Sequence, residues 1–524
     1  MRIRVDWASS ASLTGTVLKW LAVPLLVPLA LAILDGTDVL PFAAAIVVTV
    51  VAGVALEGLS DTRELRQREA FLMVALTWLG VAAVGAIPFF LTGVGADPDS
   101  SFYNPIGAVG NGDLAAILVV LSAFVDALFE SMSGLTTTGA TIMSGWDFEN
   151  QSRAIMFWRQ LIQWLGGLGI LVVAIGLLSN LMVGGAQLME TETQTRNVTK
   201  LTPEIERTAR LIWGLYVGLT LAAAATLYGL YLLGFAPNMD LFNAVSHAFT
   251  SVATAGFSPE VDSLAAFSPA AQLALIPFMI LGATNFVLLY AIVRGDLERP
   301  LRSEEFRFYL GVIVLFSVTV ALILGLDSTV EMGVGETVRH ALFNVVSIVT
   351  TTGYASMDFN VWSPAATYFL FLGMFVGGMA GSTTCSIKTL RWLVICKALL
   401  RNLFVSIHPQ AVRPVRLGES VVEEDTINDI FAYVMLALVL FFLLTIVVIA
   451  DATRVDTTVS EFEALGASAA IFLNIGPAFG LAGPLENYAA FPLSTRADMI
   501  VMMWVGRIEI IPVLVLLLPA YWES

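Results

Sequence analysis

The chain has few of the side chains that bind metals or form disulfides. Its 524 residues include 2 cysteines and 3 histidines. Cys385 and Cys396 lie eleven positions apart in one apolar stretch, which matches neither a disulfide framework nor a zinc-ligand spacing. We expect both cysteines to be packed as small apolar side chains, as free cysteine usually is.

Charge is scarce as well. Charged residues make up 13% of the chain, about half of the roughly 25% that is usual in soluble domains. Hydrophobic residues make up 57%, and the mean hydropathy is +0.83. These values exclude an ordinary soluble protein and indicate an integral membrane protein. Apolar runs that predict membrane spans include 20–33, 39–56, 71–91, 211–233, 308–325, 430–450 and 498–518.

Lysine is the rarest charged residue and occurs only at positions 19, 200, 388 and 397. Arginine supplies the remaining positive charge, and the net charge is −16. An acid-rich, lysine-poor chain favours loops adapted to high salt and hence a halophilic source, with ordinary compositional drift as the alternative. The acidic balance also argues against a nucleic-acid partner.

The positive residues concentrate in alternate loops. By the positive-inside rule these loops face the cytoplasm, so we expect both chain ends inside. The start, MRIRVDWASS, has no small-residue cleavage site after its apolar stretch, so we expect no cleaved signal peptide. The residues assigned to the cytoplasmic side are Arg2, Arg4, Lys19, Arg63, Arg66, Arg68, Arg196, Lys200, Arg207, Arg210, Arg294, Arg299, Arg302, Arg307, Arg391, Lys397, Arg401, Arg413 and Arg416.

One pattern occurs four times: a short amphipathic run, then a turn of threonines or small residues that ends in glycine. The copies at 126–139, 243–256, 340–353 and 463–476 align without a gap. Each lies between apolar segments whose far ends we place in the cytoplasm, so each must enter the membrane from outside and return outside. We interpret each copy as a half-helix plus an extended loop. Such backbone is tolerated at membrane depth where it is buried in protein or lines water, so the turns should face a pore.

The expected fold is an all-α polytopic membrane protein, with four pseudo-repeated helix–re-entrant pore loop–helix units around one pore. Two extra N-terminal transmembrane helices occupy residues 1–67, and the pore repeats follow at 68–190, 204–297, 304–405 and 424–520. No long hydrophilic stretch remains, so we expect any nucleotide-sensing module on another chain.

The turns have the chemistry of a filter for a dehydrated monovalent cation. Backbone carbonyls can replace the water around the ion, glycine permits the strained backbone, and threonine adds a stiff side chain behind the loop. The half-helices point their negative C-terminal ends at the pore. Turns 136–139 and 350–353 meet these needs best. A single such turn could equally mediate helix packing, whereas four aligned copies favour the filter.

Longer motifs resemble those of a known family. DALFESMSGLTTTGAT, FWRQLIQWLGGLGI, FNAVSHAFTSVATAGFS, GSTTCSIKTLR, NIGPAFG and VGRIEIIPVLVL occur in this order over nearly the whole chain. They resemble the TrkH/TrkG/KtrB superfamily of potassium transporters, and the two extra N-terminal spans favour its TrkH branch. The resemblance implies potassium uptake across a prokaryotic cytoplasmic membrane. It also implies a homodimer with one pore per subunit and a cytoplasmic, nucleotide-binding regulatory subunit of the TrkA type.

The resemblance further implies that potassium, the transported ion, is bound at the four turns. The carbonyl ligands would come from the residues next to the four glycines, and Ala478 stands where the family often has a second glycine in the fourth turn. The implied filter residues are Thr137, Thr138, Gly139, Thr254, Ala255, Gly256, Thr351, Thr352, Gly353, Asn474, Ile475 and Gly476.

A run of small and polar residues interrupts the apolar stretch 368–400 in the third unit. Such residues lower helix stability, so the segment 377–386 should unwind; a small-residue packing face is the alternative. The resemblance identifies the segment as an intramembrane gating loop, in which Thr384, Cys385 and Ser386 replace more usual glycines. The predicted gate residues are Gly377, Gly378, Ala380, Gly381, Ser382, Thr383, Thr384, Cys385 and Arg507.

Arg507 lies in the last apolar run, where a charge usually faces a cavity or a partner. We predict that it projects toward the pore beneath the filter, against the gating loop. A salt bridge with Glu509 or another buried acid is the alternative.

Further polar residues have two possible roles each. Acids on the half-helices either attract cations or hydrogen-bond the loop backbone; these are Asp126, Glu130 and Glu463. Arg159 and Gln163 lie one helical turn apart and either support the filter or have a plain structural role.

Potassium uptake through a channel-like pore has several alternatives. One is a cation-coupled symporter or a poorly selective monovalent cation transporter. An intramembrane enzyme would need a paired-acid, metal or nucleophile set, which the spans lack apart from the half-helix acids and histidines. A carrier of small solutes is usually built from inverted repeats, whereas these four repeats share one orientation.

Overall fold

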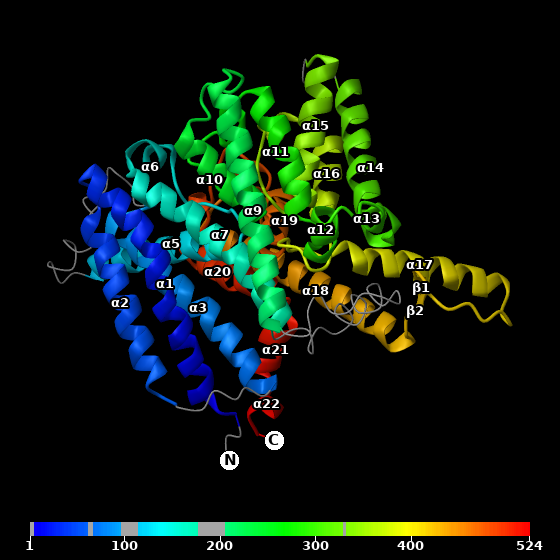
Figure 1. Ribbon diagram of the computed structural model, residues 1–524, viewed down its shortest axis with the longest axis horizontal. Helices are drawn as coiled ribbons and strands as arrows, with labels where there is room; N and C mark the ends of the chain where they lie inside the picture. Colours follow the sequence, from blue (N-terminus) through cyan, green and yellow to red (C-terminus); the bar gives the residue numbers. More distant parts are fainter. Residues whose placement is uncertain (1–4, 61–66, 96–113, 177–204, 328–331, 524) are drawn as a thin grey trace. The chain divides into compact units, whose positions relative to one another are not determined.

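The computed structural model describes residues 5–60, 67–95, 114–176, 205–327 and 332–523 (Figure 1). Parts of the expected first and second repeats, between residues 177 and 204, lie outside the described residues, as do Arg2, Arg4, Arg63, Arg66, Arg196 and Lys200. In the described residues the secondary structure is helical except for one antiparallel pair, β1 (Arg416–Leu417) and β2 (Ser420–Val421).

Seven helices in the described ranges are long and apolar enough to cross a membrane, or nine if two sharply bent helix pairs each count as one span. This confirms the prediction of an all-α polytopic membrane protein. The chain divides into two compact units. The first comprises Met1–Gly166, Ala255–Ala266 and Leu444–Ser524, and the second comprises Gly167–Thr254 and Phe267–Leu443.

The first unit begins with the two extra spans, which pack through glycine. A Cβ atom on Gly15 would lie 2.6 Å from the Gly53 carbonyl oxygen, so the two helix backbones are in close contact. Lys19 and Glu57 form an ion pair across the same contact. The helices of this unit are α1 (Trp7–Asp35), α2 (Val39–Glu57), α3 (Gln67–Thr92), α5 (Leu114–Leu135), α6 (Gly145–Asn150), the first part of α7 (Arg153–Gly176), the last part of α18 (Glu424–Arg454), α19 (Glu461–Phe472), α20 (Leu493–Arg507), α21 (Ile511–Leu517) and α22 (Pro519–Glu523), with short 3-10 turns at η2 (Ser263–Ala266), η4 (Gly480–Ala482) and η5 (Tyr488–Ala490).

The second unit holds the middle of the chain. Its long helices α9 and α14 are apolar, and its shorter helices carry polar caps, such as Asp240 before α10 and Ser268 before α11. The helices are the last part of α7, α9 (Ile205–Leu232), α10 (Leu241–Val252), α11 (Pro269–Gly282), α12 (Phe286–Val293), α13 (Glu298–Arg302), α14 (Glu304–Leu326), α15 (Val334–Val349), η3 (Phe359–Val361), α16 (Pro364–Gly373), α17 (Thr389–Ile407) and the first part of α18.

Three helices that follow a glycine turn are broken. The predicted interruption in the third repeat is present, because residues 374–388 between α16 and α17 are not helical. Two more breaks were not predicted: α11 and α12 meet at a bend of 111°, and α20 and α21 at a bend of 116°. Asn285 caps the start of α12, and Glu509 and Ile510 adopt positive φ before α21. These local features end the helices inside runs that are mostly apolar.

The cysteines are in different environments. Cys385 is buried, as predicted, whereas Cys396 is exposed on α17. The expectation of a packed side chain is therefore wrong for Cys396, because α17 turns that position away from the rest of its unit.

Candidate functional site

The four glycine turns share one unusual backbone conformation. In each copy a non-glycine residue has a positive φ, and the glycine two positions later has a positive φ as well. Residues other than glycine rarely adopt a positive φ. Such backbone strain concentrates at functional sites. The values are 55° and 79° for Thr137 and Gly139, 51° and 80° for Thr254 and Gly256, 52° and 83° for Thr351 and Gly353, and 54° and 100° for Asn474 and Gly476.

The amides of three turns point back at their own half-helix. In the first turn, Thr138 and Gly139 both donate to the Ser133 carbonyl, at 2.9 and 3.5 Å. The third and fourth turns repeat these bonds onto the carbonyls of Ser347 and Ala470. In a trans peptide the N–H and the preceding C=O point in opposite directions. The carbonyls directed away from the half-helices are therefore those of Thr137, Thr138, Thr351, Thr352, Asn474 and Ile475.

Hydroxyl groups brace the first and third turns in the same way. The Oγ1 atoms of Thr136 and Thr138 are 2.7 Å apart, and those of Thr350 and Thr352 are also 2.7 Å apart. The fourth turn has Asn474 at the equivalent of Thr137, and its Nδ2 donates to Thr138 Oγ1 at 2.7 Å. The side chains thus hold the turns from behind, and the fourth turn braces the first.

Glycine is required where the turns of the first unit meet. A Cβ on Gly139 would lie 2.4 Å from the Ala255 carbonyl oxygen. A Cβ on Gly476 would lie 2.6 Å from the Thr138 carbonyl oxygen. Because real Cβ atoms do not approach this closely, no larger residue fits at either position without displacing backbone. The first, second and fourth turns are therefore neighbours.

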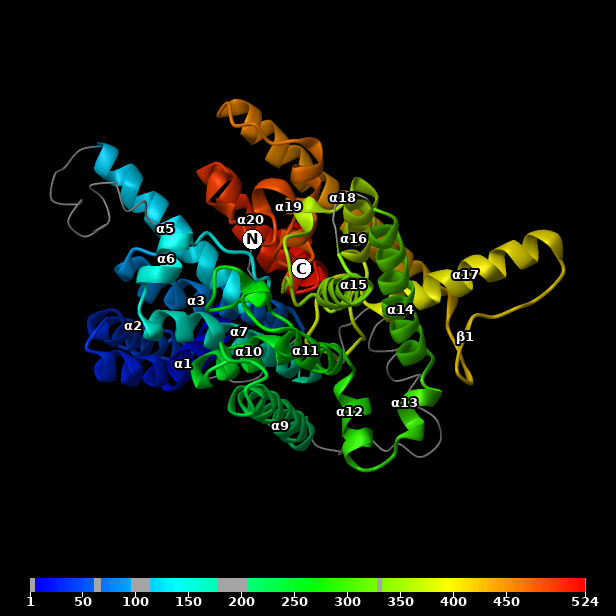
Figure 2. The same ribbon diagram turned by 90° about the horizontal axis from the view of Figure 1, so that it is seen from above.

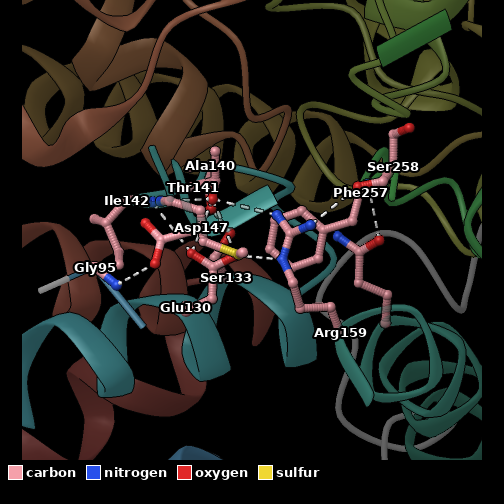
Figure 3. Close-up of polar contacts among 12 residues, drawn as sticks. Gly95, Glu130, Ser133, Ala140, Thr141, Ile142, Asp147, Arg159, Phe257 and Ser258 are labelled. Atoms are coloured by element: carbon pink, nitrogen blue, oxygen red, sulfur yellow. Dashed lines mark hydrogen bonds and ion pairs between the residues drawn. The ribbon is translucent and has the colours of Figure 1, made fainter. Parts of the chain in front are cut away.

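A buried ion pair lies beside the first two turns (Figure 3). Glu130, on α5, is fully buried and accepts from Arg159 Nε at 2.6 Å and from the Ile142 amide at 3.1 Å. Arg159, on α7, also donates to the Ser258 carbonyl at 3.0 Å, and its guanidinium carbon lies 3.9 Å from the centre of the Phe257 ring. The Glu130 carboxylate thus hydrogen-bonds loop backbone, the second of its two predicted roles.

Gln163 holds the second turn from the next turn of α7. Its Nε2 donates to the Ala255 carbonyl at 2.7 Å, and its Oε1 accepts from the Phe257 amide at 3.0 Å. One side-chain amide therefore binds backbone on both sides of Gly256. The second turn differs from the others, because the Ala255 carbonyl already accepts this hydrogen bond. The contacts of Arg159 and Gln163 favour the filter-supporting role over a plain structural one.

The two other half-helix acids also have partners. Asp126 forms an ion pair with Arg496 of α20. Glu463 closes a capping box with Ser460 and accepts from the Leu481 amide at 3.0 Å. Both acids occupy the same repeat position. Each bonds its half-helix to a residue of a later segment of the first unit, Asp126 to Arg496 and Glu463 to Leu481.

The predicted gating segment binds the break between α11 and α12. The amides of Met379 and Thr383 donate to the carbonyls of Ala283 and Gly282, at 3.0 and 3.3 Å. In return, Asn285 Nδ2 donates to the Ala380 carbonyl at 2.8 Å. Backbone groups that leave a helix inside a membrane need partners. The two irregular segments supply each other with these partners.

The gating segment also contacts two of the turns in the second unit. Thr383 Oγ1 lies 3.0 Å from Thr254 Oγ1, and the Cys385 amide donates to Thr351 Oγ1 at 3.1 Å. Behind the segment, the fully buried Glu305 accepts from the Ala380 amide at 2.7 Å and from Thr389 Oγ1 at 3.3 Å. Glu305 and Asn285 were not predicted as site residues, since each lies at the edge of an apolar run and belongs to no recognisable motif.

Arg507 is buried at the end of α20. It donates to the Gly166 carbonyl at 3.1 Å, and its guanidinium carbon lies 5.6 Å from the centre of the Trp78 ring. The adjacent Gly506 packs on the end of α19, because a Cβ there would lie 2.0 Å from the Phe472 carbonyl oxygen. Arg507 is thus next to the base of the fourth turn. Its predicted contact with the gating loop stays a prediction.

Comparisons with known proteins identify the family. Residues 117–524 match the family model TrkH, described as cation transport protein. The chain is 36% identical to the Trk system potassium uptake protein TrkH of Halomonas elongata, over 88% of this chain and 87% of that protein. It is 32% identical to the protein of that name from Vibrio parahaemolyticus, over 99% of this chain and 100% of the relative.

A solved structure is similar over the same length. The crystal structure of the potassium transporter TrkH from Vibrio parahaemolyticus matches with a TM-score of 0.82 and 28% identity, over 99% of this chain and 100% of that chain. The family model covers well over half of the chain. The chain therefore belongs to the TrkH family of cation transport proteins.

Proposed function

We propose that this protein takes up potassium across the cytoplasmic membrane through a channel-like pore with a four-loop carbonyl filter. The shared backbone of the four turns carries the proposal, since strained loops with outward carbonyls are what a dehydrated cation needs. Relatives named Trk system potassium uptake proteins support the choice of ion. Membership of a family of transport proteins excludes the intramembrane enzyme.

The filter ligands follow from the direction of the carbonyls. We assign potassium to the carbonyl oxygens of the first, third and fourth turns and to Thr254 of the second. The Ala255 oxygen is shared with the Gln163 amide, so its contribution to the ion is weaker. The threonine hydroxyls bond within and between the turns and keep the carbonyl spacing fixed.

The gate is proposed to be the segment from Gly377 to Cys385 together with Arg507. The segment contacts the second and third turns through Thr383 and Cys385, which supports a position just inside the filter. A buried guanidinium at the base of the fourth turn would repel cations there until it moves.

Partners and orientation complete the proposal. We expect a homodimer with one pore per subunit, a TrkA-type cytoplasmic subunit that binds nucleotide, and both chain ends in the cytoplasm of a halophilic prokaryote. Val5 and Tyr521 lie in one apolar cluster of the first unit, which supports placing both ends on the same side of the membrane.

The alternative is a cation-coupled symporter or a poorly selective monovalent cation transporter. The unequal turns favour weaker discrimination, because Asn474 and Ala255 replace threonines of the first and third turns. Flux under set ion gradients separates these possibilities. A symporter moves potassium uphill when a second ion is supplied, whereas a channel does not.

Growth of a potassium-transport-deficient host tests the proposal. Expression of this chain should restore growth at low potassium, as a known potassium transporter does in the control. Purified protein in liposomes should carry potassium faster than sodium. Absence of rescue beside a rescuing control, together with no potassium flux in liposomes, would contradict the proposed function.

A further inference from the structure

A cavity outside the turns lies at the C-terminal half of α17, in the second unit. It has a volume of about 420 Å³ and is lined by α17 and by the chain that leads to β1. Four of its lining residues are cationic: Lys397, Arg401, Arg413 and Arg416. This concentration of positive charge contrasts with the net charge of −16 of the chain.

Acidic neighbours neutralise half of this charge. Lys397 pairs with Glu304, and Arg401 pairs with Glu424. The Arg413 guanidinium carbon lies 4.9 Å from the centre of the Phe404 ring. Among the described residues neither Arg413 nor Arg416 has an ion-pair partner. The cavity therefore keeps about two unneutralised positive charges.

Apolar side chains are exposed next to the cationic ones. Leu400 and Val412 line the cavity and are 66% and 97% exposed. Leu403 and Ile407 continue the apolar surface along α17, at 55% and 75% exposure. Figure 1 and Figure 2 both show α17 running across the direction of α14. A helix with basic and apolar surfaces that runs across a membrane span has the character of an element lying in the membrane interface.

We propose that this cavity binds the phosphate headgroup of an anionic phospholipid from the cytoplasmic leaflet. Arg413 and Arg416 would hold the phosphate oxygens, since guanidinium groups match phosphate geometry. The acyl chains would cover Leu400, Leu403 and Ile407. Basic pockets on the cytoplasmic side of membrane proteins recognise anionic lipid in this way. The site lies outside the four turns, and its place in the cytoplasmic leaflet rests on the proposed function.

The charge alone would also suit a soluble phosphate compound, and the apolar surface alone would suit a protein partner. Phospholipid is favoured because it supplies both a phosphate and an apolar chain at the place where the cationic and apolar residues meet. The test therefore compares whole lipid with its soluble headgroup.

Native mass spectrometry of the full-length protein in detergent measures the affinity directly. The probes are phosphatidylglycerol, phosphatidylcholine with the same acyl chains, and glycerol 3-phosphate. We expect phosphatidylglycerol to bind tightest, and Arg413→Gln with Arg416→Gln to weaken it about tenfold or more. Arg294→Gln is the control matched to Arg413→Gln, because Arg294 is also exposed and its guanidinium carbon also lies 4.9 Å from an aromatic ring centre.

Three results would overturn the proposal. They are equal affinity for the two lipids, an equal loss of affinity for phosphatidylglycerol in the control variant, and glycerol 3-phosphate binding as tightly as phosphatidylglycerol. If the double variant fails to fold, Arg413→Gln alone carries the test, since Arg413 makes no ion pair in the described part of the chain. Unchanged affinity for phosphatidylglycerol in that variant would also refute the site.

Discussion

At the residue scale, a buried ion pair lies next to the strained backbone of the first two turns. The Glu130–Arg159 ion pair is buried there, with side chains 0% and 1% exposed. A buried pair adds little net stability, but removal of one partner leaves the other charge without compensation. The pair therefore fixes the positions of the loops that it bonds.

Glu130→Gln tests the pair. We expect it to lower the free energy of unfolding by about 3 kcal/mol, because Arg159 stays buried and charged. Thermal unfolding in detergent measures the effect. Arg302→Gln is the control: its partner Glu298 is 76% exposed, so the loss should be about 1 kcal/mol at most. Equal losses in the two variants would show that the buried pair has no special role.

Gln163 should matter for selectivity more than for folding. Gln163→Leu removes two hydrogen bonds to the second turn, and each bond is worth about 1 kcal/mol. We expect the potassium-over-sodium flux ratio to fall about fivefold or more. Gln160→Leu is a control on the same helix, since the buried Gln160 amide has no hydrogen-bond partner among the described residues. The role fails if both variants keep the wild-type ratio.

At the scale of elements, the break between α11 and α12 and the gating segment form hydrogen bonds with each other. The carbonyls freed at the end of α11 accept the amides of the gating segment, and Asn285 caps α12 while it bonds that segment. An opening of the segment must break these bonds or carry α12 along. The bend between α11 and α12 is therefore expected to move with the proposed gate rather than being a separate irregularity.

Asn285→Ala should loosen the gate. The lost bond to Ala380 is worth about 1 kcal/mol, which corresponds to about a fivefold shift toward the open state. Potassium leak from liposomes without any regulatory subunit measures this shift. Ser268→Ala removes a cap from the other end of α11 and should leave the leak unchanged. A leak that rises only in the Ser268 variant, or in neither, would contradict the role of Asn285.

The sequence could predict elements whose signal is periodic or repeated. The four turns and the unwinding of residues 377–386 have such signals, and the structure has both. The bend at Asn285 and the break after Arg507 were not predicted, since each lies in a mostly apolar run and its few polar residues, glycines and prolines form no repeated pattern. Contacts such as Glu305 with Ala380 or Gln163 with Ala255 join segments 75 and 92 positions apart. Nothing in local sequence specifies such pairs.

At the scale of the whole molecule, charge is unbalanced, with 42 acidic residues against 26 basic ones. Salt screens the repulsion among like charges, and a net charge far from zero otherwise opposes the compact state. We expect the unfolding midpoint in detergent to rise by several degrees between about 0.1 and 2 M potassium chloride. A falling midpoint would contradict adaptation to high salt and favour compositional drift.

The glycine turns are proposed to select potassium. The most direct measurement is the potassium-over-sodium flux ratio of Gly139→Ser in liposomes, with Gly145→Ser as control. Gly139 has φ 79° and no room for a Cβ beside Ala255, whereas a Cβ on Gly145 meets nothing within 4 Å. We expect Gly139→Ser to lose most of its preference for potassium and Gly145→Ser to keep the wild-type flux ratio. An unchanged ratio in a folded, conducting Gly139→Ser protein would show that the turns are not the filter.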